Sequence, residues 1–108
     1  MKYLTKAEEM FLLAIWRLKD NAYGLTLRKQ IRESSHIDYS YGTLYGILDQ
    51  LTHKEYIDRI KGDPTPKRGG RSKIYYRITP RGIEALKKAM EIHKTVWQGI
   101  NELSFNRV

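Results

Sequence analysis

The sequence contains no cysteine among its 108 residues. A disulfide framework, a thiolate metal site and a cysteine nucleophile are therefore excluded. Long apolar runs are also missing. No window approaches the ~18 apolar residues of a membrane-spanning helix, and residues 1–10 lack the apolar stretch of a signal peptide. We expect a soluble, cytoplasmic protein with no membrane partner.

Acidic residues are scarce. Aspartate and glutamate together number 12, against 20 lysines and arginines, which gives a formal net charge of +8. Such an excess favours a polyanionic partner, with nucleic acid first and an anionic membrane surface second. The length is that of one domain with a small core.

An amphipathic helix is predicted within residues 40–56. Apolar residues at i, i+3, i+4 and i+7 form one helix face, namely Leu44, Ile47, Leu48 and Leu51. Ser40 precedes them as a capping residue. The opposite face has short or aromatic, mostly uncharged side chains: Tyr41, Thr43, Tyr45, Gly46, Gln50 and His53. Such a face can approach base edges in a major groove, although a solvated helix face can have the same composition.

A first helix is predicted near the N-terminus. Thr5 and Glu8 fit a capping box. The almost unbroken apolar run over residues 10–16 indicates a helix that is buried on several sides. In so small a chain, we expect this helix to contact both the core and a partner subunit, the latter through Phe11 and Ile15.

A second, shorter helix is predicted over residues 25–33. Leu27 and Ile31 are its inward residues at i and i+4. Residues 34–39 connect it to the helix that begins after Ser40. The order is therefore helix-turn-helix.

A basic hairpin is predicted next. Residues 57–61 alternate between apolar and polar, as in a half-buried strand, and residues 73–78 do so less regularly. The intervening residues 62–72 are rich in glycine and proline. This hairpin carries seven basic and two acidic residues, a net charge of +5. We expect Tyr75 and Tyr76 to divide between the core and the outer face. A strand, basic loop and strand directly after a helix-turn-helix describe a winged helix.

A last helix is predicted to start at Thr79 and Pro80. Apolar and aromatic residues then recur in steps of three and four: Ile83, Leu86, Met90, His93, Trp97 and Ile100. This heptad seam is too short for an independent coiled coil but sufficient for packing across a two-fold axis. We predict a homodimer, with a winged-helix domain at residues 1–79 and a dimerisation helix at 80–108. The predicted interface residues are Phe11, Ile15, Leu86, Met90, His93, Trp97 and Ile100.

Two interpretations of His93 and Trp97 stay open. In the first, both residues simply pack in the subunit interface. In the second, they line a pocket between subunits, together with Trp16, because aromatic walls are common in ligand sites. The second interpretation predicts a small aromatic effector.

A set of motifs extends from the first helix to the start of the last: the apolar helix at 9–18, Tyr23-Gly24, Gly42-Thr43-Leu44-Tyr45, Gly70-Arg71, Lys73-Ile74-Tyr75-Tyr76 and Thr79-Pro80-Arg81-Gly82. Together they resemble the PadR family of bacterial transcriptional regulators, winged-helix homodimers that repress genes and often respond to small molecules. The resemblance implies that residues 41–50 form the recognition helix and residues 67–73 the wing tip. It also implies that the last helix dimerises with help from the first.

The sequence therefore predicts a mainly α-helical fold with a small β-hairpin, a winged helix-turn-helix followed by a dimerisation helix. The predicted function is sequence-specific binding of double-stranded DNA by a homodimeric repressor. Release from DNA by a small aromatic effector is an extension of this hypothesis. The predicted DNA-contacting residues are Ser40, Tyr41, Thr43, Tyr45, Gln50, Lys67, Arg68, Arg71 and Lys73.

A winged-helix module that serves mainly as a ligand sensor, or as a protein–protein interaction domain, is the alternative hypothesis. An enzyme is not expected, because His36, His53 and His93 lie on different elements with no acid or nucleophile in a recognisable arrangement. No cofactor or metal is expected.

Overall fold

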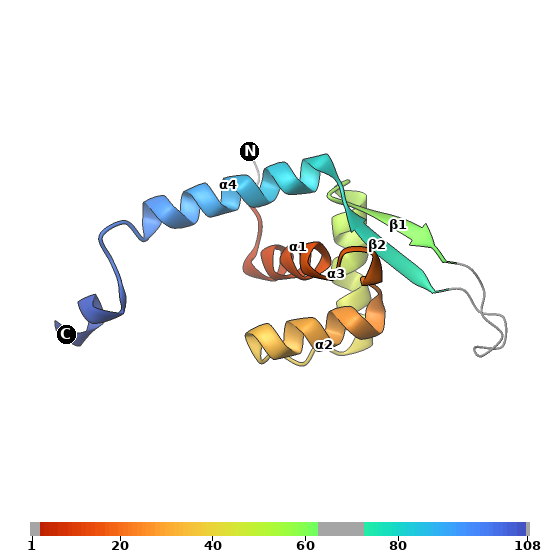
Figure 1. Ribbon diagram of the computed structural model, residues 1–108, viewed down its shortest axis with the longest axis horizontal. Helices are drawn as coiled ribbons and strands as arrows, with labels where there is room; N and C mark the ends of the chain where they lie inside the picture. Colours follow the sequence, from red (N-terminus) through yellow and green to blue (C-terminus); the bar gives the residue numbers. More distant parts are fainter. Residues whose placement is uncertain (1–2, 63–72, 108) are drawn as a thin grey trace.

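The computed structural model describes residues 3–62 and 73–107 (Figure 1). Its elements are α1 (Lys6–Leu18), η1 (Lys19–Asn21), α2 (Gly24–Ser35), α3 (Tyr41–His53), β1 (Ile57–Lys61), β2 (Ile74–Ile78), α4 (Pro80–Val96) and η3 (Glu102–Arg107). The two strands form an antiparallel hairpin. The predicted fold class, a mainly helical winged helix-turn-helix with a C-terminal helix, is confirmed.

Three helices begin at hydroxyl caps, as their sequences predict. In α1, the amide of Glu8 donates to Oγ1 of Thr5 at 3.1 Å, and the amide of Thr5 donates to Oε1 of Glu8 at 2.9 Å. This is the reciprocal capping box. Ser40 caps α3 by accepting from the amide of Thr43. Thr79 caps α4 through the amide of Gly82, with Pro80 in the first turn.

The core is built around α1. Its fully buried apolar residues pack with those of α2, α3 and the hairpin: Phe11, Leu12, Ala14, Ile15, Ala22, Leu27, Ile31, Leu44, Leu48, Leu51, Ile57 and Tyr76. Phe11 is 0% exposed and Ile15 is 1% exposed. These two side chains therefore leave no surface for a second subunit, which corrects their predicted place at an interface. The exposed apolar side chains of α1 are instead Leu13 and Trp16.

The hairpin is attached to the helical body along β2. The amide of Tyr76 donates to the carbonyl oxygen of Ala22 at 2.8 Å, and Tyr23 forms a β-bridge with Tyr75. Tyr76 is buried, whereas the partly exposed ring of Tyr75 packs edge-on against Tyr23. The predicted division of the two tyrosines is confirmed for Tyr76. The base of the wing is thereby fixed relative to α2.

Helix α4 starts beside the hairpin, crosses α1 and continues beyond the core (Figure 1). The molecule is 59 Å long. The helix ends at Val96, with Trp97 as its C-cap, and Gly99 follows with a φ of +79°. The predicted helical seam is therefore too long, because Ile100 lies in the turn after the helix. None of the helices in the described part of the chain is long and apolar enough to span a membrane.

Candidate nucleic-acid interface

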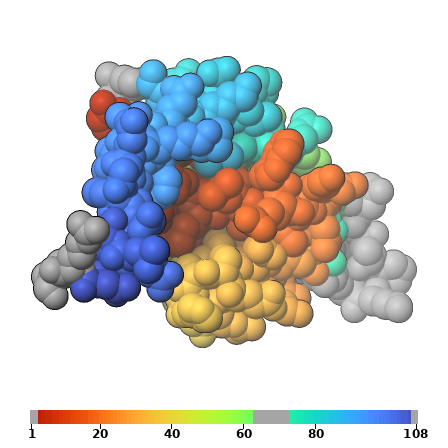
Figure 2. Space-filling view, turned by 60° about the vertical axis from the view of Figure 1, so that its left-hand side comes forward, coloured from red at the N-terminus to blue at the C-terminus, as the bar shows by residue number. Residues whose placement is uncertain are grey.

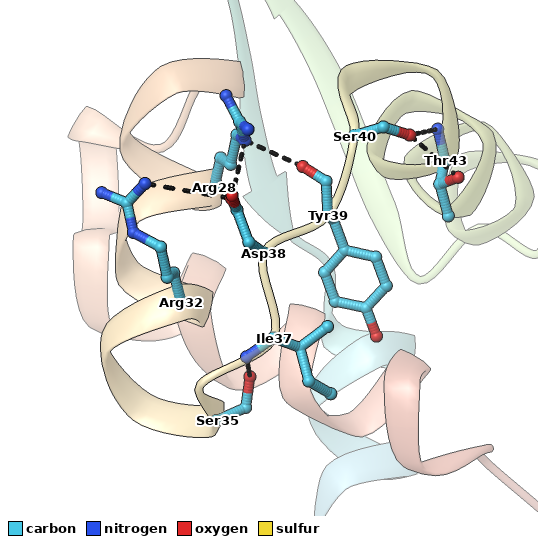
Figure 3. Close-up of polar contacts among 8 residues, drawn as sticks. All are labelled: Arg28, Arg32, Ser35, Ile37, Asp38, Tyr39, Ser40 and Thr43. Carbon is cyan, nitrogen blue, oxygen red and sulfur yellow. Dashed lines mark hydrogen bonds and ion pairs between the residues drawn. The ribbon is translucent and has the colours of Figure 1, made fainter.

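The connector between α2 and α3 is held by arginines of α2 (Figure 3). Nε of Arg28 donates to the carbonyl oxygen of Tyr39 at 2.8 Å and lies 3.1 Å from Oδ1 of Asp38. Nη1 of Arg32 is 3.9 Å from the same Asp38 oxygen. The guanidinium of Arg28 also lies over the ring of Tyr41, 4.8 Å from its centroid. These contacts fix the angle between the two helices of the helix-turn-helix.

Two stacked tyrosines extend from the first turns of α3. The rings of Tyr41 and Tyr45 are 6.2 Å apart with an interplanar angle of 25°, and they are 39% and 42% exposed as residues. Tyr45 reaches the N-terminus of α2, where a Cβ at position 24 would come within 2.9 Å of its Cζ atom. Gly24 therefore allows α3 to pack closely against the start of α2. The two rings form an exposed aromatic pair at the start of α3.

The rest of this surface has short side chains. Gly42, Thr43 and Gly46 are exposed, and a Cβ at either glycine would meet no atom within 4 Å. Oγ1 of Thr43 accepts a hydrogen bond from Ser40 at 3.1 Å. The backbone of α3 can therefore approach another surface closely on this side. The predicted residues Ser40, Tyr41, Thr43 and Tyr45 are all exposed here.

Gln50 has a role that its position in the sequence does not reveal. Its amide nitrogen donates to Oε2 of Glu8 at 3.1 Å, and Nζ of Lys54 lies 2.5 Å from the same oxygen. Glu8 is only 2% exposed. Burial raises the pKa of Glu8. Hydrogen bonds from Lys54 and Thr5, together with the charge of Lys54, lower this pKa by more than burial raises it, so the net shift is downward. Gln50 is exposed, and its amide nitrogen is engaged with Glu8.

The described part of the wing carries cationic side chains on β1 (Arg59 and Lys61), on β2 (Arg77) and directly before β2 (Lys73). Nζ of Lys73 lies 4.2 Å from the ring centroid of Tyr23, and Arg77 is 4.0 Å from Asp58. Lys67, Arg68 and Arg71 lie outside the described residues. Of the predicted wing contacts, Lys73 is therefore the one whose position is known, at the junction of wing and body.

Two open grooves follow the length of α4. One, of about 550 Å³, lies between α1 and α4 and is mainly apolar, with Leu13, Trp16 and Met90 among its lining. The other, of about 510 Å³, lies on a second side of α4 and includes Trp97. His93 lines both grooves and stacks on Trp97 with ring centroids 5.7 Å apart. The predicted effector residues are thus not together in one chain, since Trp16 and Trp97 line different grooves.

Met90, His93 and Trp97 of the predicted seam line these grooves, whereas Ile100 lines neither. Met90 is 54% exposed and Trp97 is 46% exposed, whereas Leu86 packs partly against the core. Ile100 is 46% exposed in the turn beyond α4.

Among the residues that the structure describes, no group of three or more histidines and carboxylates is placed to hold a metal ion.

A helix-turn-helix that is followed directly by a basic two-stranded hairpin defines a winged-helix DNA-binding protein. The chain belongs to the PadR-like family of transcriptional regulators. Residues 12–88 match the family described as "Transcriptional regulator PadR-like family". The predicted family is thus confirmed. Since these are DNA-binding regulators and not enzymes, the predicted class of function is confirmed as well.

Solved structures agree with this assignment. A PadR family transcription regulator from Clostridium difficile is 28% identical, with a TM-score of 0.58 over 82% of this chain and 86% of that one. A PadR-like regulator from Bacillus cereus is 21% identical, with a TM-score of 0.62 over 86% and 92%. F93 from STIV, a winged-helix DNA-binding protein, is 20% identical, with a TM-score of 0.68 over 93% and 100%. No curated protein matches the sequence significantly.

Proposed function

We propose that the protein is a sequence-specific repressor that binds its operator as a homodimer. The observation that carries this proposal is the exposed surface of α3, with its mostly short side chains, beside a basic hairpin. A helix with such a surface can enter a major groove, while flanking cations bind the phosphates. In this proposal, residues 1–79 form the DNA-binding unit and residues 80–108 the dimerisation unit.

The contacts divide between α3 and the wing. Tyr41 and Thr43 are assigned to base edges, because both residues are exposed at the start of α3. Ser40 and Tyr45 are assigned to the flanking backbone. Phosphate or minor-groove contacts are assigned to the wing residues Lys67, Arg68, Arg71 and Lys73.

The experiment that tests this function is a binding titration with the DNA upstream of the protein's own gene and with a scrambled control, at two salt concentrations. A preference of ~10³-fold or more for one upstream fragment would establish specific recognition. If the upstream DNA is not preferred, sites are selected from random DNA by the same protein. Equal, salt-sensitive binding to every sequence after that selection would overturn sequence-specific regulation.

A second candidate function, ligand sensing, is supported by the grooves along α4. Their aromatic and apolar lining is typical of small-molecule sites. Binding of a planar aromatic compound there would change the fluorescence of Trp16 or Trp97. If the protein is an effector-controlled repressor, that change follows the loss of operator affinity over the same concentration range. A fluorescence change with no loss of affinity would contradict the sensing role.

A further inference from the structure

We infer that Glu8 is a positioning residue for DNA recognition, because it determines which end of the Gln50 side-chain amide faces outward. Gln50 then offers its carbonyl oxygen to the DNA, and this oxygen accepts a hydrogen bond from the amino group of an adenine or a cytosine in the major groove. The inference rests on the proposed function, in which α3 enters that groove. It goes further by naming the class of base that Gln50 recognises and a residue outside α3 that sets this preference.

The carboxylate of Glu8 only accepts hydrogen bonds. Glu8 is 2% exposed, and the net shift of its pKa is downward, so this carboxylate is ionised at neutral pH. Oε1 accepts from the amide of Thr5 at 2.9 Å, and Oε2 accepts from Nζ of Lys54 at 2.5 Å. An ionised carboxylate carries no proton to donate. A side chain that hydrogen-bonds to Glu8 must therefore present a donor.

This requirement assigns the orientation of the Gln50 amide. Nε2 of Gln50 lies 3.1 Å from Oε2 of Glu8. If the amide were turned over, its oxygen would face the carboxylate, and two acceptors would meet without a proton between them. The observed hydrogen bond is also charge-assisted, which makes it stronger than one between neutral groups. The nitrogen is therefore held against Glu8, and the oxygen on the same carbon points away from that carboxylate.

Gln50 lies on the side of α3 that the proposed function places against DNA. Thr43 and Gln50 are seven positions apart, which is about two turns of an α-helix, so they share one face. Gly46 lies between them, and a Cβ there would meet no atom within 4 Å. All three residues are exposed. With no side chain at Gly46, this surface is open from Thr43 to Gln50.

The helix that carries Glu8 is packed on several sides. Helix α1 contacts α2, α3 and α4, and Figure 2 shows it between α4 and α2 on one face of the molecule. The reciprocal capping box with Thr5 fixes the first turn of α1. Glutamine has several rotatable bonds, so ordering it at an interface costs conformational entropy. Glu8 orders the amide of Gln50 before DNA binds, which reduces that cost.

The outward end of the amide determines which group of a base pair is favoured. In the major groove, each pair offers an amino group on adenine or cytosine and a carbonyl oxygen on thymine or guanine. The oxygen of Gln50 accepts from the amino group but cannot bind the carbonyl oxygen. A glutamine that turns freely can bind either group, because it can also offer its nitrogen. Glu8 therefore limits Gln50 to the amino group of the contacted pair.

A scan of the operator first locates the contact. Each position of the operator obtained in the titrations above carries each of the four base pairs in turn, and binding by the parent is compared with binding by Gln50→Met. Methionine is unbranched like glutamine but has no amide. The position at which Gln50→Met loses discrimination is the one that Gln50 contacts. If no position changes, this inference is overturned while the DNA-binding function stands. If the parent selects no operator, the proposed function and this inference fall together.

Base analogues at that position then identify the group that Gln50 binds. The adenine or cytosine is replaced by an analogue without the amino group, and we expect the parent to lose about 10-fold in affinity. Gln50→Met should lose nothing further from this replacement. A loss of affinity that instead follows removal of the carbonyl oxygen from the paired thymine or guanine would overturn the assigned orientation.

Glu8→Gln tests the positioning role. The neutral amide can still complete the capping box, but it can donate as well as accept, so the amide of Gln50 is free to turn. We expect the cost of removing the amino group from the base to fall to about twofold or less. Glu9→Gln is the matched control, because it makes the same change of charge on α1, where Glu9 pairs with Lys6. This control should keep the full cost.

A double variant separates positioning from a general loosening of α3. When Glu8→Gln is added to Gln50→Met, discrimination at the contacted position should stay unchanged, because Glu8 acts there through Gln50. A further loss of discrimination in the double variant would overturn the positioning role. The same conclusion would follow if Glu8→Gln alone kept the full cost of removing the amino group.

Discussion

At the residue scale, Gly82 has the least room of the described glycines that pack against backbone. A Cβ there would overlap the carbonyl oxygen of Tyr56 and lie 2.8 Å from Cγ1 of Ile78. The amide of Gly82 also donates to the Thr79 cap. Gly82→Ala therefore forces α4 away from Tyr56, the residue before β1, and we expect it to lower the free energy of unfolding by about 1–3 kcal/mol. Urea denaturation measures this change.

Gly46→Ala is the matched control, because a Cβ at Gly46 would meet nothing within 4 Å and its helix gains from alanine. We expect this variant to raise the free energy of unfolding by up to ~1 kcal/mol. If both variants shifted the denaturation midpoint in the same direction, close packing at Gly82 would not be the cause.

The buried carboxylate of Glu8 links α1 to the end of α3. It accepts hydrogen bonds from Thr5, Gln50 and Lys54, and these are charge-assisted. We expect Glu8→Gln to lower the free energy of unfolding by about 2 kcal/mol at neutral pH. Lys54 retains partial access to water, which limits the cost of leaving it unpaired.

The pH dependence of that difference has a definite sign. The folded protein holds the pKa of Glu8 below its ordinary value, so the unfolded chain binds a proton more readily. The stability from the ionised carboxylate is thus present above the ordinary carboxyl pKa and lost as pH falls through the lowered folded pKa. Parent and Glu8→Gln should therefore converge in denaturation experiments in that acidic range. A difference independent of pH would indicate that the charge of Glu8 contributes nothing.

At the element scale, α3 and the wing are expected to contribute differently to DNA binding. Thr43→Ala removes a hydroxyl from the exposed side of α3. It should lower the discrimination between the operator and an operator with one changed base pair at the contacted position by about 1–3 kcal/mol. Lys73→Ala removes a cation from the wing. It should weaken binding to operator and scrambled DNA alike. It should also reduce the slope of the log binding constant against log salt concentration by about one unit.

Titrations of both variants against both DNAs, at several salt concentrations, separate these effects. Leu25→Ala, an exposed substitution on α2, is the control for handling and folding. If Thr43→Ala and Lys73→Ala had the same profile, the division between base contacts from α3 and phosphate contacts from the wing would be wrong.

The elements that were predictable from sequence are those with local signals. The hydroxyls of Thr5, Ser40 and Thr79 cap helices within their own first turns, so short-range spacing reveals them. The alternation in residues 57–61 likewise identified β1. Such features need no knowledge of the tertiary fold.

The features that sequence reasoning missed depend on distant contacts. Phe11 and Ile15 lie on a helix that is apolar almost all round, and only the packed fold decides which apolar side faces the core. Gln50 and Glu8 are 42 positions apart, and no local pattern connects them. The seam through Ile100 followed a regular spacing, but α4 ends at Val96, before Gly99 turns the chain with a φ of +79°.

At the scale of the whole molecule, the protein is elongated. The helix-turn-helix and hairpin lie toward one end of the 59 Å axis, and the end of α4 with η3 lies at the other (Figure 1). The proposed dimer through residues 80–108 would leave both copies of α3 free. It would also set one distance between them. The spacing of operator half-sites is therefore a property of the proposed dimer and not of a single chain.

This spacing gives the last prediction. Two-fold related recognition helices bind half-sites about one helical turn apart, or a multiple of it, on one face of the duplex. Inserting about half a turn of DNA between the half-sites rotates one of them to the opposite face, and we expect the dimer to lose ~10²-fold or more in affinity because only one unit can bind. Inserting a full turn restores the common face and should recover part of that affinity. Gel-shift titrations of the three operators measure the effect. Equal affinity for all three would mean that each chain binds DNA independently, and the homodimeric operator complex would have to be abandoned.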